Sequence, residues 1–166
     1  MSTAALVERL AAALRGAGAT MVTAESCTGG LVAGACTDLA GSSEWFERGV
    51  VCYSNAAKFE LLGVAATLIA AHGAVSSEVA RAMAHGALAM SPARFAVAVT
   101  GIAGPGGGTE AKPVGTVWIA VCERGRPAET MLLQASGDRA AVRSSAVERA
   151  LELLLAAVER SAASRV

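Results

Sequence analysis

RFAVAVTG, residues 94–101, is the stretch from which the fold of this chain can be worked out. It is a continuous apolar run of strand length, which is typical of a central strand covered on both faces. A sheet with such a strand needs helices on each of its sides. The stretch therefore predicts an α/β protein with helices above and below the sheet.

Segments with helical and strand patterns alternate on either side of this run. Leu6, Leu10 and Leu14, spaced by four residues, predict an amphipathic first helix over residues 3–15. The last two expected strands form a hairpin that turns at residues 124–127. We expect residues 1–166 to form a single domain, a three-layer α/β/α sandwich with a mixed sheet. Strands are expected at about 19–24, 48–53, 94–101, 114–123 and 128–136, and further helices at 28–39, 54–62, 65–72, 76–90 and 137–161.

The composition excludes several classes of protein. Hydrophobic residues make up 54% of the chain and aromatic residues only 4%, so we expect a core of small side chains in closely spaced layers. Fourteen basic residues balance fourteen acidic ones, and a nucleic-acid partner is therefore not expected. No stretch reaches the ~18 apolar residues of a membrane helix. Glu8 and Arg9 interrupt the apolar core that a signal peptide would need, so the sequence indicates a cytoplasmic protein.

The four cysteines do not form a metal-binding pattern. Cys27, Cys36, Cys52 and Cys122 contain no CxxC pair and have no histidine at metal-ligand spacing. We expect no metal site and no cofactor, and simple packing roles for three of the four. Cys27 is the exception, because it lies inside a second unusual stretch, TAESCTGG at residues 23–30.

TAESCTGG lies at the corner between the first expected strand and the second expected helix. A serine at such a corner stands at the positive end of a helix, where the N–H groups of Thr28, Gly29 and Gly30 can stabilise an oxyanion. Ser26 is therefore a candidate nucleophile. The alternative is that Ser26 or Thr28 is only the N-cap of the helix, a standard role for both residue types.

A serine nucleophile needs a base, and lysine is a better candidate here than histidine. His72 lies at an expected helix end and His85 lies mid-helix among alanines, where structural roles are the default. Lys58 is flanked by apolar residues, and burial would lower its pKa enough for a neutral amine to accept the serine proton. Tyr53 lies five residues earlier and is able to orient the lysine or relay a proton. The alternative is a solvated helix lysine beside a core tyrosine.

Residues 100–116, TGIAGPGGGTEAKPVGT, form a third unusual stretch. Its glycines expose backbone N–H groups that can bind an anion, and Lys112 adds a charge, which favours a phosphate-binding loop. The stretch matches neither the Walker pattern nor the dinucleotide fingerprint, so a flexible connection is the alternative. The candidate binding residues are Gly104, Gly106, Gly107, Gly108 and Thr109.

Two arginines open the last expected helix one turn apart. Arg139 and Arg143 can face a phosphate or a carboxylate, while surface salt bridges are the default role for such residues.

Four segments, in this order, resemble the C-terminal domain family of the competence/damage-inducible protein CinA: AESCTGG, YSNAAKFELLGV, VTGIAGPGGGTEAKPVGTV and GDRAAVR. The family's standalone members are nicotinamide mononucleotide deamidases. The resemblance therefore implies hydrolysis of the carboxamide of nicotinamide mononucleotide to nicotinic acid mononucleotide and ammonia. It also implies a metal-free serine/lysine mechanism in which Ser26 is the nucleophile and Lys58 the general base. Tyr53 and Arg139, in preference to Arg143, belong to the same implied site.

Two other functions remain open at this point. A non-catalytic nucleotide-binding or regulatory module could use the same scaffold, because a fold alone does not establish an activity. A thiol enzyme could use Cys27, although a helical corner would point that side chain away from Ser26. The expected ligand is a small nucleotide. The small, apolar helices suggest that the protein is a homodimer.

Overall fold

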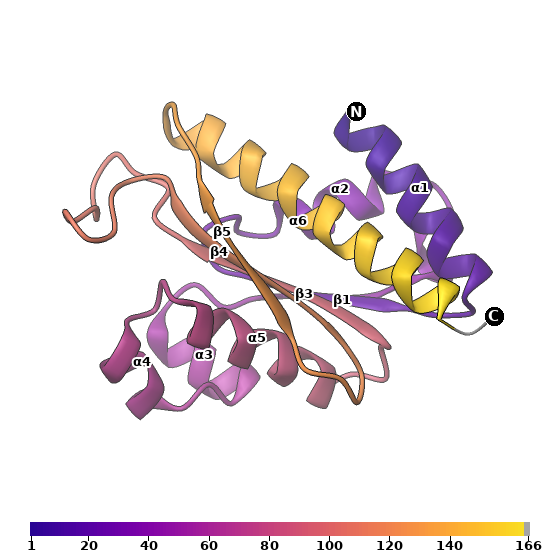
Figure 1. The fold of residues 1–166 in the computed structure, drawn as a ribbon, viewed down its shortest axis with the longest axis horizontal. Helices are drawn as coiled ribbons and strands as arrows, with labels where there is room; N and C mark the ends of the chain where they lie inside the picture. Colours follow the sequence, from indigo (N-terminus) through magenta and orange to yellow (C-terminus); the bar gives the residue numbers. More distant parts are fainter. Residues whose placement is uncertain (165–166) are drawn as a thin grey trace.

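A computed structural model describes residues 1–164 and has the expected three layers, with one mixed sheet between two sets of helices (Figure 1). None of the helices within the described residues is both long and apolar enough to span a bilayer. The strands are β1 (Met21–Glu25), β2 (Phe46–Val51), β3 (Phe95–Gly101), β4 (Thr116–Glu123) and β5 (Glu129–Gln134). The helices are α1 (Thr3–Gly16), α2 (Leu31–Thr37), α3 (Asn55–Leu62), α4 (Ala66–His72), α5 (Ser77–Ala89) and α6 (Arg139–Ala163), and a 3₁₀ turn lies at Ser42–Glu44.

The sheet has the strand order β2-β1-β3-β4-β5 and is both parallel and antiparallel. β1 runs parallel to β2 and β3, whereas β3, β4 and β5 form the antiparallel part with the expected hairpin. Glu25, the last residue of β1, pairs with Val51 on one side and Val99 on the other. The chain segments that follow the three parallel strands therefore begin at the same edge of the sheet, where ligands of open α/β sheets usually bind.

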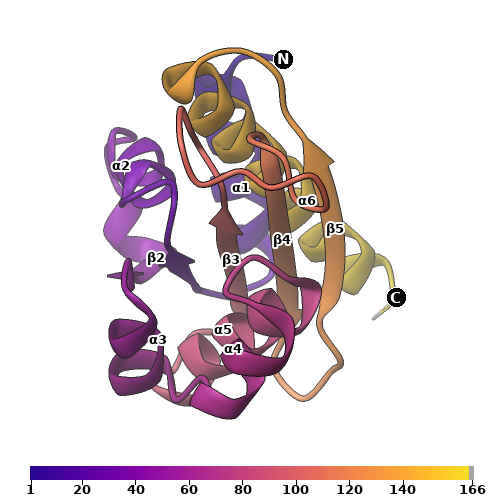
Figure 2. The ribbon, with the colours of Figure 1, turned by 90° about the vertical axis from the view of Figure 1, so that its left-hand side faces the viewer.

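The central strand β3 is covered on both faces, as its unbroken apolar sequence predicts. Helices α1, α2 and α6 cover one face and α3, α4 and α5 the other (Figures 1 and 2). Val97 and Val99 belong to the first core, while Ala96 and Ala98 belong to the second. These alanines face α5, which packs against β3 and β4.

The prediction that the second helix begins at Thr28 is wrong, because α2 begins at Leu31. Gly29 and Gly30 have φ angles of 57° and 98°, which lie outside the right-handed helical region. The chain therefore makes a separate tight turn between β1 and α2. This turn, residues 26–29, carries Ser26 and is called the Ser26 turn below.

Candidate active site

The Ser26 turn extends β1 at the edge of the sheet where the parallel strands end. The N–H of Ser26 donates to the carbonyl oxygen of Val99 over 2.9 Å, so the backbone is still attached to β3 at this point. The N–H of Gly29 then donates to the carbonyl oxygen of Ser26 over 3.0 Å and closes the turn. Ser26 is 8% exposed, so its hydroxyl is nearly buried but can be reached from the sheet edge.

Glu25, the residue before the Ser26 turn, binds the start of α2 with its side chain. Its carboxylate accepts hydrogen bonds from the N–H groups of Val32 (2.8 Å) and Ala33 (3.0 Å) and from the hydroxyl of Thr23 (3.2 Å). A buried carboxylate thus occupies the positive end of α2, which favours negative charge. The alternative that Ser26 or Thr28 is only the N-cap of this helix is wrong, because Gly30 is at the cap position and Glu25 supplies the acceptor.

Replacing Glu25 by glutamine is expected to lower the free energy of unfolding by about 1–3 kcal/mol, because a buried N–H of α2 loses its acceptor. The matched control is Glu44→Gln, which removes an exposed partner of Arg15 and should cost less than about 1 kcal/mol. Urea denaturation of both variants measures the difference. Equal values for the two variants would contradict the capping role of Glu25.

Lys58 is buried against the Ser26 hydroxyl. Its Nζ lies 3.1 Å from Ser26 Oγ, 3.2 Å from the carbonyl oxygen of Cys52 and 3.2 Å from that of Tyr53. The side chain is only 1% exposed, and this burial lowers the pKa of the amine. A neutral amine has two N–H groups and one lone pair. When the two carbonyl oxygens accept both N–H groups, the lone pair is left to face the hydroxyl of Ser26.

The local sequence explains how Lys58 reaches this position. The hydroxyl of Ser54 accepts the N–H of Ala57 over 3.0 Å and caps α3, so Lys58 lies in the first turns of the helix. Helical side chains lean toward the N-terminus of their helix. The amine is thereby directed to the segment that has just left β2, the neighbour of β1.

Tyr53 and Arg139 lie at the outer side of this pair. Tyr53 contacts the amine of Lys58 with its backbone carbonyl, while its hydroxyl accepts from Arg139 over 3.0 Å. Arg139 also donates to the carbonyl oxygen of Gly104 over 2.7 Å. Because Tyr53 is 59% exposed, the open side of the site lies here. Arg139 thus connects α6, the segment after β2 and the glycine-rich loop.

The glycine-rich loop between β3 and β4 is connected to the site through Gly104, in its first part. Gly104 has a φ of 83°, and a Cβ there would lie 2.5 Å from the side chain of Val114, so glycine is needed for the loop to close on itself. Lys112 is directed elsewhere, since its Nζ donates to the carbonyl oxygen of His72 over 2.8 Å. Figure 2 shows the loop close to the first turn of α6. The exposed outer part of the loop contains Gly106, Gly107, Gly108 and Thr109.

Arg143 holds the Ser26 turn itself. Its Nε donates to the carbonyl oxygen of Cys27 and one of its terminal nitrogens donates to that of Thr28, both over 3.1 Å. The sequence predicts a phosphate, a carboxylate or a surface salt bridge as the partner of this arginine, whereas the structure gives it two backbone carbonyl oxygens. Its spacing of four residues from Arg139 places both on one face of α6, but nothing in the sequence identifies backbone carbonyls as its partners.

A family model described as the CinA C-terminal domain matches residues 3–158. The chain belongs to this family. The nicotinamide-nucleotide amidohydrolase PncC of Escherichia coli K12 is 53% identical over 149 residues, which are 90% of each chain. Among solved structures, the competence/damage inducible protein CihA of Agrobacterium tumefaciens is 46% identical with a TM-score of 0.90, over 94% of this chain and 98% of its own. A CinA superfamily protein of Klebsiella pneumoniae 700603 is 39% identical with a TM-score of 0.92, over 96% and 99%.

The cysteines of this CinA domain are poor nucleophiles. Cys27 is 5% exposed, and burial raises the pKa of its thiol to about 11. Burial likewise raises the pKa of Cys36 to about 12. A thiolate attacks far more readily than a thiol, so both groups are unsuited to attack at neutral pH. Within residues 1–164, no three histidine, cysteine, aspartate or glutamate side chains are grouped to hold a metal ion.

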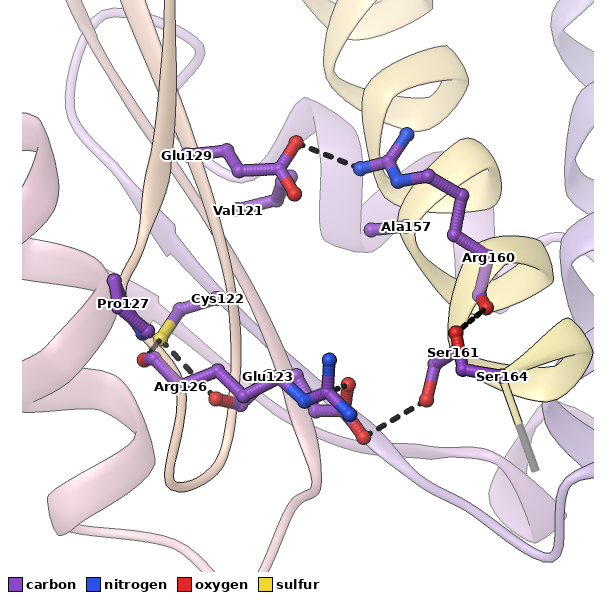
Figure 3. Close-up of a pocket in the computed structure, with 10 residues that line it drawn as sticks. All are labelled: Val121, Cys122, Glu123, Arg126, Pro127, Glu129, Ala157, Arg160, Ser161 and Ser164. Carbon is purple, nitrogen blue, oxygen red and sulfur yellow. Dashed lines mark hydrogen bonds and ion pairs between the residues drawn. The ribbon is translucent and has the colours of Figure 1, made fainter.

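A cavity of about 190 Å³ lies at the opposite edge of the sheet of this CinA domain (Figure 3). Glu123 borders the cavity and pairs with Phe95, the first residue of β3. Ser26 lies near the other end of β3, because Glu25, the residue before it, pairs with Val99. Its polar groups bind one another. Arg160 is paired with Glu129 at 2.6 Å, and the hydroxyl of Ser161 donates to Glu123 over 2.9 Å. The cavity is therefore separate from the candidate active site.

Proposed function

We propose that this protein hydrolyses the carboxamide of nicotinamide mononucleotide to give nicotinic acid mononucleotide and ammonia. The observation that carries the proposal is the 3.1 Å approach of a buried lysine amine to a serine hydroxyl at the ligand-binding edge of the sheet. The relationship to PncC of E. coli, named as a nicotinamide-nucleotide amidohydrolase, supplies the substrate. Ser26 is the nucleophile and Lys58 the general base in this proposal.

In the first half of the reaction, Lys58 accepts the proton of Ser26 as its Oγ attacks the carboxamide carbon. The negative charge that develops on the amide oxygen is stabilised by N–H groups of the Ser26 turn. The N–H of Gly29 is already bonded to Ser26, whereas the N–H of the buried Thr28 donates to no acceptor within residues 1–164. The C–N bond then breaks, Lys58 returns its proton to the leaving nitrogen, and ammonia departs from a nicotinoyl ester of Ser26.

In the second half, water replaces the amine. Lys58 accepts a proton from the water as its oxygen attacks the ester carbon, and the same charge appears on the carbonyl oxygen. The ester bond breaks, the proton passes from Lys58 to Ser26 Oγ, and nicotinic acid mononucleotide leaves. The sum of the two halves is amide plus water giving carboxylic acid plus ammonia, with the enzyme returned to its starting state.

The phosphate of the substrate is bound on the open side, away from the reacting amide. Arg139 supplies the charge, and the loop residues Gly104, Gly106, Gly107, Gly108 and Thr109 supply N–H groups and a hydroxyl. The exposed ring of Tyr53 borders the entrance, and its hydroxyl orients Arg139. Thr28, Gly29 and Gly30 border the end that holds the amide. Binding energy from the phosphate thereby positions the amide carbon at Ser26.

The direct test is ammonia release from nicotinamide mononucleotide by the purified protein, measured with and without EDTA. The expected result is turnover that EDTA leaves unchanged, with nicotinic acid mononucleotide as the second product. Binding of the nucleotide without ammonia release would instead indicate a non-catalytic nucleotide-binding module. Neither binding nor turnover would remove this nucleotide as the substrate.

Arg139→Met is expected to lower kcat/KM for nicotinamide mononucleotide about ten- to a hundredfold, because a charge-assisted hydrogen bond to the phosphate is lost. The same variant should use nicotinamide riboside, which lacks the phosphate, as well as the wild type does. Steady-state kinetics with both substrates measures the ratio. An equal loss on both substrates would place Arg139 at the amide or in the framework of the site instead.

A further inference from the structure

The carbonyl groups of the Ser26 turn are held by a charged side chain that the proposed mechanism leaves without a role. Arg143 donates from two adjacent nitrogens to two consecutive carbonyl oxygens, those of Cys27 and Thr28. These are the central residues of the turn closed by the Gly29–Ser26 hydrogen bond. The guanidinium therefore binds the turn directly at its backbone, 116 and 115 residues away in the sequence.

The charge of Arg143 is not shared with a carboxylate. Within residues 1–164 it takes part in no ion pair, whereas Arg149 on the same helix is paired with Glu152 and Arg160 with Glu129. Its positively charged guanidinium instead lies against the carbonyl oxygens of two peptide groups. The pKa of Cys27 responds to it, since Arg143 opposes the rise that burial causes.

The orientation of the peptide groups sets what this charge does. The peptide between Cys27 and Thr28 is trans, because the cis bond in the described chain is that of Gly104–Pro105. In a trans peptide the C=O and the N–H point in opposite directions. With the Cys27 carbonyl held by Arg143, the N–H of Thr28 points away from α6. A cation on the carbonyl oxygen withdraws electron density from the peptide and strengthens its N–H as a donor.

We propose that Arg143 is a positioning residue for the reaction, which fixes the Ser26 turn and strengthens the Thr28 N–H that receives the oxyanion. This proposal rests on the proposed function. Arg143 acts through the backbone and does not touch the substrate. Arginine is required because its planar fork binds two neighbouring oxygens at once, which the single amine of lysine cannot do in the same geometry.

The kinetic test compares Arg143→Met and Arg143→Lys with the wild type on nicotinamide mononucleotide. Both variants are expected to lose on the order of 10²-fold in kcat, the size of effect seen when an oxyanion donor is removed. KM should change by less than about threefold, because ground-state binding is untouched. Added guanidinium ion should restore part of kcat in Arg143→Met and none in Ser26→Ala. Arg149→Met, which removes an exposed arginine of the same helix, is the control and should behave as wild type.

Two kinetic outcomes would overturn the proposal. A wild-type kcat in Arg143→Lys would mean that a charge without the fork is sufficient. A raised KM with unchanged kcat in either variant would mean that Arg143 binds the substrate. Arg143→Lys keeps the stem and the charge, so it serves alone if Arg143→Met does not fold.

Hydrogen exchange tests the role of Arg143 independently of the proposed function. Amides of the peptide covering residues 23–31 should exchange at least about tenfold faster in Arg143→Lys than in the wild type or in Arg149→Met, because the turn has lost its two anchors. This measurement needs no substrate. A wild type without ammonia release would contradict the proposed function. Unchanged amide exchange rates in Arg143→Lys would contradict the role of Arg143.

Discussion

Replacing Ser26 by alanine is expected to lower ammonia release from nicotinamide mononucleotide by at least about 10³-fold, because the hydroxyl that forms the proposed acyl intermediate is lost. The fold should persist, because the hydroxyl is a small group whose contact is with the amine of Lys58. The loss in unfolding free energy should be about 1 kcal/mol or less. Initial rates of ammonia release and a thermal unfolding curve measure the two quantities.

Two control variants make this result specific to Ser26. Cys27→Ala removes the neighbouring thiol and should keep the rate within about threefold, since the raised pKa of that thiol makes it a poor nucleophile. Ser43→Ala removes an exposed hydroxyl outside the site and should have no effect. Activity that survives in Ser26→Ala but disappears in Cys27→Ala would transfer the nucleophilic role to the thiol.

Lys58→Met is expected to lower kcat by about 10³-fold with a much smaller change in KM, because a general base contributes chiefly to the transition state. Methionine keeps the length and apolar contacts of the stem. The matched control is Lys112→Met, which removes the other lysine of the chain, a half-buried side chain bonded to the carbonyl oxygen of His72. A loss in KM alone would make Lys58 a substrate-holding residue.

The pH dependence of the wild type provides an independent readout for Lys58. The amine must be neutral to accept a proton, so the rate rises as the pH increases through the pKa of Lys58 in the folded protein. Burial lowers that pKa, so the rising limb of the rate profile should lie below the value of about 10.4 that is usual for lysine. The residual activity of Lys58→Met should lack this limb. A limb at the usual lysine value would contradict an amine desolvated beside Ser26.

The sequence predicts the fold and the central pair of the site because the signals involved are local. The unbroken apolar run at residues 94–101 requires cover on both faces, and the structure has helices on both. Lys58 can be singled out because apolar neighbours surround it on a short capped helix, and the structure buries it. The parallel pairing of β1 with β2 then brings Lys58 to Ser26, although their roles in catalysis remain predictions.

Other features escape prediction because their partners are distant or are backbone atoms. The start of α2 is misplaced because two glycines in the left-handed region separate Thr28 from the helix. Glu25 caps α2 from outside the helix, a contact for which the sequence has no standard spacing. Arg139 and Arg143 both lie near the start of α6 and give the same sequence signal, yet one reaches Tyr53 and the other reaches the Ser26 turn. Only the packing of α6 on the sheet distinguishes them.

The order of these parts along the chain has a consequence for folding. Ser26 and Lys58 come from the first half of the chain, but the arginines that hold their surroundings come from α6, which packs beside α1 and is tied to it by the Arg9–Glu159 pair. A chain in which α6 has not yet docked carries the proposed nucleophile and base without either arginine in place. On the proposed function, the protein therefore acquires its activity only after α6 has docked.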